Sequence, residues 1–149
     1  MSSVADFTDG KFQMVIPDAA TEPAEVRTVL LTSGKIYYEV EAYRRANNIT
    51  DMAILRLEQL YPVPRRTLDR VLTAYPTVTD FRWVQEEPAN QGAWPFLAVA
   101  LPEQVPRLTG IKRISRRAMA APSAGPVLEI DDVVAGLANT RKGLLRNGE

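Results

Sequence analysis

"VRTVLLTSGKIYYEVEAYRRANN", residues 26–48, is the stretch that decides the fold. It begins with VRTVLLT, a short run rich in apolar and β-branched residues, which is typical of a strand buried inside a sheet. A serine and a glycine follow, and then Ile36, Val40 and Tyr43 recur at helical spacing with charged residues between them. Two asparagines end this pattern. The stretch therefore predicts a strand, a tight turn and an amphipathic helix.

The same alternation of strands and helices continues along the chain. Further strands are expected over residues 51–57, 78–85 and 110–116, and helices over residues 65–75 and 92–105. In the third strand, alternation places Phe81 and Trp83 on one face. Strands that alternate with helices need crossover connections, so the sequence predicts an α/β fold with a mainly parallel sheet.

The two ends of the chain do not continue this pattern. Residues 1–25 have no lasting periodicity and are interpreted as an N-terminal arm or linker, in which FQMVI could pair briefly with a strand. Residues 26–125 form the predicted domain, and residues 126–149 a final helix with a basic tail. A chain of 149 residues suffices for one domain with its own core, and we expect no second domain.

Composition excludes several classes of function. The chain contains no cysteine and no histidine, which excludes thiolate catalysis, a Ser-His-Asp triad and metal sites built from these two residue types. Eighteen basic residues balance eighteen acidic ones, so no net charge attracts nucleic acid or a membrane. The N-terminus lacks the pattern of a signal peptide, and no apolar run approaches the roughly 20 residues that span a bilayer. A soluble, cytoplasmic protein is expected.

The glycine–lysine pair at residues 34–35 resembles part of a phosphate-binding loop. The complete pattern needs a glycine at position 29 and a hydroxyl residue at position 36, where this chain has Val29 and Ile36. The sequence therefore argues against a nucleoside triphosphatase. An anion could still bind free N–H groups at the helix N-terminus beside Lys35. A plain tight turn is the favoured interpretation.

"VQEEPANQGAWPF", Val84 to Phe96, is a second candidate site. Neighbouring side chains on an extended segment point to opposite faces, so the two glutamates cannot form the facing carboxylate pair of a glycosidase. The stretch follows the carboxyl end of a parallel strand, where α/β sheets form crevices. We expect a crevice or an interface lined by Glu86, Glu87, Asn90, Gln91 and Trp94. A strand-to-helix turn with Trp94 as a packing or interface anchor explains the stretch equally well.

A basic cluster near the fourth strand is the third candidate. It consists of Lys112, Arg113, Arg116 and Arg117. Arginines at a strand end suit recognition of phosphate or carboxylate, because the guanidinium group donates two hydrogen bonds at once. Solvated charges with salt bridges are an equally good explanation. Aromatic residues are not interleaved with the bases, which argues against a nucleic-acid surface.

Four motifs in order carry a resemblance to a known family: VLLTSGKIYYEVEAYRR, AILRLEQLYPVP, VQEEPANQGAWPF and KRISRRAMAAPSAG. Together they resemble the C-terminal domain of the first, decarboxylating component of 2-oxoglutarate dehydrogenase. The residues of these motifs are most similar to those of the actinobacterial enzymes that combine several 2-oxoglutarate activities. The resemblance runs from about Asp6 to Gly125, and the tail after Gly125 departs from the usual family ending.

The resemblance implies a transketolase C-terminal-like, three-layer fold with a mixed, mostly parallel five-stranded sheet flanked by helices. In the whole family enzyme, thiamine diphosphate and magnesium bind between two other domains, which also supply the catalytic histidines. The resemblance thus implies that this chain alone has no catalytic, cofactor-binding or metal-binding residue and serves in the homodimer and its assembly. Acetyl-CoA or adenine nucleotide effectors bind near this domain in the family, which implies Arg56, Arg116 and Arg117 as effector contacts.

The family enzymes are several times longer than this chain, which begins just before the C-terminal domain. We therefore expect a stand-alone or excised non-catalytic domain. Three alternatives stay open: a subunit of a split thiamine diphosphate-dependent decarboxylase, a small regulatory module for acetyl-CoA or an adenine nucleotide, and a vestigial fragment that aggregates through Trp94 and Phe96.

Overall fold

The computed structural model describes residues 11–120. Its elements in chain order are β1 (Val15–Ile16), the 3-10 helix η1 (Pro23–Glu25), β2 (Thr28–Thr32), α2 (Ile36–Ala46), β3 (Met52–Leu57), α3 (Arg65–Leu72), β4 (Asp80–Pro88), α4 (Trp94–Gln104), the 3-10 helix η2 (Pro106–Leu108) and β5 (Lys112–Arg116). All strands and helices predicted between residues 26 and 116 are present, with shifted ends. The helix predicted within residues 126–149 lies outside the described residues.

The five strands form one sheet in the order β1-β3-β2-β4-β5. Strands β2 to β5 are parallel to one another, and β1 pairs antiparallel with β3 at one edge. In the centre, Thr32 lies beside Arg56 of β3 and Val84 of β4. This arrangement confirms the α/β fold with a mixed, mostly parallel five-stranded sheet.

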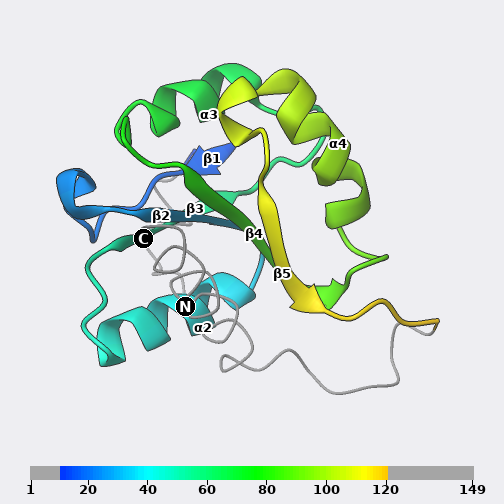
Figure 1. Cartoon of the computed structure of the whole chain (residues 1–149), viewed down its shortest axis with the longest axis horizontal. Helices are drawn as coiled ribbons and strands as arrows, with labels where there is room; N and C mark the ends of the chain where they lie inside the picture. Colours follow the sequence, from blue (N-terminus) through cyan, green and yellow to red (C-terminus); the bar gives the residue numbers. More distant parts are fainter. Residues whose placement is uncertain (1–10, 121–149) are drawn as a thin grey trace, which may run out of the picture.

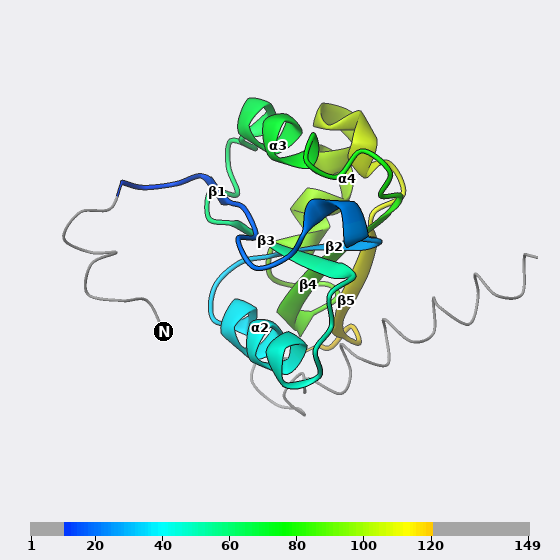
Figure 2. The ribbon, with the colours of Figure 1, turned by 90° about the vertical axis from the view of Figure 1, so that its left-hand side faces the viewer.

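Helices cover both faces of the sheet, which gives three layers. Helices α3 and α4 lie on one face and α2 on the other (Figures 1 and 2). Side chains that alternate along each strand divide into two cores: Phe81 and Trp83 face α3 and α4, whereas Leu30, Ile54 and Val84 face α2. The prediction that Phe81 and Trp83 share a face is confirmed.

Two elements end elsewhere than predicted. Helix α3 ends at Leu72 rather than near residue 75, and Arg107 donates hydrogen bonds to the carbonyl oxygens of Leu72 and Tyr75. Strand β4 continues past residue 85 to Pro88. The chain can stay extended there because Pro88 lies beside Arg116 of β5, whose carbonyl oxygen accepts a hydrogen bond from the next backbone N–H.

The described part of the N-terminal arm, residues 11–25, is fastened to the edge of the sheet. Strand β1 pairs with β3, which confirms the brief pairing expected of FQMVI. The Asp18 carboxylate accepts hydrogen bonds from Arg44 of α2 and, at 2.7 Å, from the backbone N–H of Ile54. Within residues 11–120, no helix is both long enough and apolar enough to cross a membrane.

Candidate functional site: the carboxyl edge of the sheet

The carboxyl ends of the four parallel strands lie side by side along one end of the sheet, which we call the carboxyl edge. Open α/β sheets bind their ligands at this end. Most of the site residues predicted from the sequence lie there. Arg56 is near the end of β3, Lys35 follows β2, Glu86 and Glu87 lie near the end of β4, and Arg116 ends β5. The chemistry of this edge therefore depends on what each of these side chains contacts.

Gln85 organises the corner between β4 and α4. The side chain is buried, and its Oε1 accepts hydrogen bonds from the Trp83 indole N–H at 2.8 Å and from the backbone N–H of Trp94 at 2.9 Å. Its amide nitrogen donates to three carbonyl oxygens, those of Glu87 and Pro88 at the end of β4 and that of Gln91 in the loop that follows. One buried amide thus fixes both the path of the loop and the start of α4.

Gln85 was not predicted as a site residue, although the sequence contained a signal for it. The alternation of β4 places position 85 on the same face as Phe81 and Trp83, so a polar side chain there faces the core. A buried polar side chain needs partners to offset the loss of water. The sequence does not show that the partners lie in the next loop.

Asn90 and Gln91 bind the loop to the segment after β5. The Asn90 side chain donates to the carbonyl oxygen of Met119 at 2.9 Å and accepts from its N–H at 3.0 Å. The Gln91 amide donates to the same carbonyl oxygen at 3.3 Å. Gly92 completes the turn with φ of +64°, and an added Cβ would lie 2.9 Å from Glu87 Cβ, so glycine is required there. The two side-chain amides predicted to line a crevice connect the loop after β4 to the segment after β5.

The two glutamates point to different surroundings, as their adjacent positions on a strand predict. Glu86 Oε1 lies 2.8 Å from Lys35 Nζ across the edge of the sheet. This hydrogen bond and the charge of Glu86 raise the pKa of the Lys35 ammonium group. Glu87 is exposed and lies against Gly92. Lys35 therefore has a carboxylate partner, and the two glutamates do not face each other.

The three arginines predicted as effector contacts are not gathered into one cluster. Arg56 pairs with Glu58 at 3.0 Å, and its guanidinium carbon lies 4.8 Å from the centre of the Tyr37 ring. The Nε of Arg116 donates to the carbonyl oxygen of Glu86 at 2.8 Å, whereas Arg117 is exposed. Strands β2 and β4 separate β3 from β5, which keeps the backbones of Arg56 and Arg116 at least about 14 Å apart.

The other two members of the basic cluster have partners within the domain. Lys112 Nζ lies 3.2 Å from an Asp80 carboxylate oxygen, which also pairs with the buried Arg82. Burial of Asp80 opposes its ionisation, but hydrogen bonds and positive charge from Arg82 and Lys112 outweigh burial and lower the pKa of Asp80. The Arg113 guanidinium carbon lies 5.6 Å from the Trp94 ring centre. Trp94 itself packs against the larger core.

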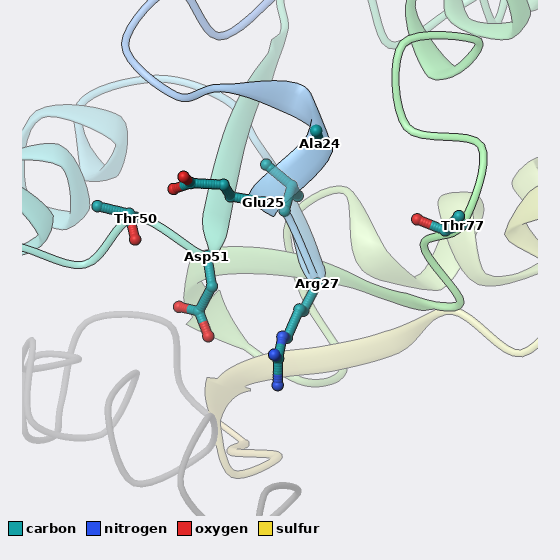
Figure 3. Close-up of a pocket in the computed structure, with 7 residues that line it drawn as sticks. Ala24, Glu25, Arg27, Thr50, Asp51 and Thr77 are labelled. Atoms are coloured by element: carbon teal, nitrogen blue, oxygen red, sulfur yellow. The ribbon is translucent and has the colours of Figure 1, made fainter.

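A shallow hollow of about 650 Å³ lies at the opposite edge, beside the amino ends of β2 and β3 (Figure 3). Its polar lining comprises Glu25, Arg27, Thr50, Asp51 and Thr77. The carbonyl oxygen of Asp51 accepts hydrogen bonds from the N–H groups of Arg27 and Thr28, which holds the two strand ends together. Most residues predicted as a site from the sequence lie at the other edge, whereas Lys112 and Arg113 begin β5 and lie at the amino ends of the strands.

Within residues 11–120, no group of three or more Asp or Glu side chains is placed to hold a metal ion.

The geometry defines an α/β domain whose polar side chains at the carboxyl edge bond largely to one another and to the backbone. The family model for the C-terminal region of 2-oxoglutarate dehydrogenase matches residues 1–132. This chain belongs to that family. The resemblance inferred from four motifs is confirmed, and the match continues seven residues beyond Gly125.

Similar proteins come from mycobacteria. The multifunctional 2-oxoglutarate metabolism enzyme of Mycolicibacterium vanbaalenii is 50% identical over 131 residues, which cover 84% of this chain and 10% of the relative. The enzyme of the same name from Mycobacterium sp. (strain JLS) is 51% identical over 131 residues, with the same coverage of both chains. The chain thus spans about a tenth of the length of the curated relatives that it matches.

Proposed function

We propose that this chain is a non-catalytic C-terminal domain that contributes to the assembly and dimer contact of a 2-oxoglutarate dehydrogenase first component. The observation that carries the proposal is the use of Gln85, Asn90, Gln91 and Arg116 in hydrogen bonds within the chain. Such bonds stiffen a corner that could otherwise present polar groups to a substrate. In this proposal other domains hold thiamine diphosphate and magnesium, and the enzyme works in the cytoplasm.

The proposal predicts that the chain alone does not decarboxylate 2-oxoglutarate. The assay supplies thiamine diphosphate, magnesium and an artificial electron acceptor. A second sample contains the Mycobacterium sp. (strain JLS) enzyme truncated to remove the segment that matches this chain. We expect no turnover from the chain alone and co-elution of the two proteins in size-exclusion chromatography. Turnover by the isolated chain, or failure of the folded partner to bind it, contradicts the proposal.

The same mixture distinguishes the proposal from a split enzyme. A split enzyme needs a side chain from this domain to act on the substrate, and Glu86 and Glu87 are the carboxylates at the end of β4. Replacing both by glutamine preserves size while removing charge. An assembly domain with these changes still binds and supports the turnover of the mixture. Loss of turnover with unchanged binding instead identifies a split enzyme.

We also propose effector binding at the carboxyl edge, because Arg116 ends β5 there and is followed directly by the exposed Arg117. Acetyl-CoA and adenine nucleotides are polyanions that guanidinium groups recognise well. Calorimetric titration should give a Kd on the order of micromolar. Combined Arg116→Ala and Arg117→Ala substitution should abolish the binding, whereas Arg27→Ala at the opposite edge should not. Binding that survives the double substitution excludes this site.

A further inference from the structure

An aromatic pair is exposed on the side of the domain that carries α3 and α4. Tyr61 is 80% exposed and Phe96 is 40% exposed. Their ring centres lie 5.9 Å apart at 66°, an edge-to-face contact made outside the core. Val99, one turn further along α4, is 59% exposed. Single exposed apolar residues are ordinary, but this contiguous group marks an interaction surface.

Basic side chains border this aromatic pair. The residue after Tyr61 is Pro62, which lines a groove of about 400 Å³ together with Met14, Gln59, Arg65 and Arg66. Helix α3 carries three arginines, at positions 65, 66 and 70, against one acidic residue, Asp69. Asp69 lies 3.8 Å from Arg65 and offsets one of these charges, so α3 keeps a net positive charge. The positive end of the α3 dipole lies at the same place.

We propose that this docking surface, made of Met14, Tyr61, Arg65, Arg66, Phe96 and Val99, binds an acidic face of the preceding domains of the enzyme. The inference rests on the proposed assembly function and names the surface and the charge of its partner. Tyrosine, phenylalanine, methionine and arginine are the residues enriched at interface centres, and a basic border selects a negatively charged partner.

The relatives indicate which molecule covers this surface. This chain accounts for 10% of the relatives' length, so nine tenths of each relative is available as a covalently attached partner. A second copy of this chain is a poor occupant. A two-fold contact would bring two copies of the same basic surface together, and like charges repel. The partner is therefore an acidic surface with at least one apolar side chain to contact Tyr61 and Phe96.

The test uses the truncated strain JLS enzyme as the probe and measures its Kd for the full chain by calorimetry. Reversing two charges with Arg65→Glu and Arg66→Glu should weaken binding by at least about tenfold, and Tyr61→Ser by a similar factor. The matched control is Arg27→Glu with Arg45→Glu, which makes the same charge change at exposed sites outside the docking surface. The control should change Kd by no more than about twofold.

The outcomes separate the inference from the proposed function. Binding that the docking-surface variants leave unchanged overturns the inference and leaves the assembly function standing. Absence of any complex overturns both. Dimerisation of the free chain that Tyr61→Ser abolishes overturns the acidic partner in favour of a second copy. Because all the substituted side chains are exposed, circular dichroism and Tm should match those of the wild type, which ties the loss of affinity to the surface.

Discussion

Asp18→Ala should lower the free energy of unfolding by about 3–5 kcal/mol, because it leaves an uncompensated charge inside the protein. The Asp18 and Arg44 side chains form an ion pair and are only 3% and 4% exposed. After the substitution, the Arg44 guanidinium keeps a hydrogen bond to the carbonyl oxygen of Met52 at 3.3 Å, which does not compensate its charge. The backbone N–H of Ile54 also loses its acceptor. Urea denaturation followed by tryptophan fluorescence measures the change.

A matched control is Asp69→Ala, which removes the partner of Arg65 in an exposed pair on α3. We expect a loss of no more than about 0.5 kcal/mol, because exposed ion pairs contribute little to stability. Asp18→Asn keeps an acceptor oxygen and removes the charge, so its loss should fall between the two. A loss for Asp18→Ala that is no larger than the loss for Asp69→Ala contradicts the assigned role of the buried pair.

The same pair has a consequence for solubility. Strand β1 pairs with β3 only at Arg56 and Leu57, so the Asp18 carboxylate takes the place of a strand partner at Ile54. An open strand edge is a template for pairing between chains. Asp18→Ala should therefore also increase self-association at concentrations where the wild type is unchanged, which light scattering would detect.

Gln85→Leu should lower the free energy of unfolding by about 2–4 kcal/mol, because leucine fills similar space but makes no hydrogen bonds. The Trp83 indole N–H would stay buried without its acceptor, and α4 would lose the side chain that accepts from its first N–H. Three carbonyl oxygens, two at the end of β4 and one in the following loop, would lose their donor. Chemical denaturation gives the stability, and the indole N–H resonance of Trp83 reports the local change.

The control for this substitution is Gln91→Leu. The Gln91 side chain is half-buried and donates to the carbonyl oxygen of Met119 at 3.3 Å, so its loss should cost no more than about 1 kcal/mol. Equal effects of the two substitutions would show that Gln85 does not organise the corner. A selective effect of Gln85→Leu on binding to the truncated relative, with stability retained, would instead assign Gln85 to the interface.

Much of the fold could be predicted because it depends on patterns that a single segment carries. The apolar run at residues 26–32 and the helical spacing of Ile36 and Val40 each bury one face or one stripe, whatever the partner is. The corner at Val84 to Phe96 was placed correctly at the carboxyl end of a strand. The sequence did not show that the strand runs through both glutamates to Pro88, because that extension depends on Arg116 of β5.

The sequence by itself determined the family, the order of strands and helices, and the alternation that gives each strand its two faces. Only the tertiary structure decided which polar groups meet. Asp18 lies in a stretch interpreted as an arm, yet it pairs with Arg44, 26 positions away. Arg107 binds the carbonyl oxygen of Leu72, 35 positions away, where α3 ends. Periodicity is a property of one segment in contact with an apolar environment, whereas a hydrogen bond or ion pair needs two specific atoms that only the folded chain brings together.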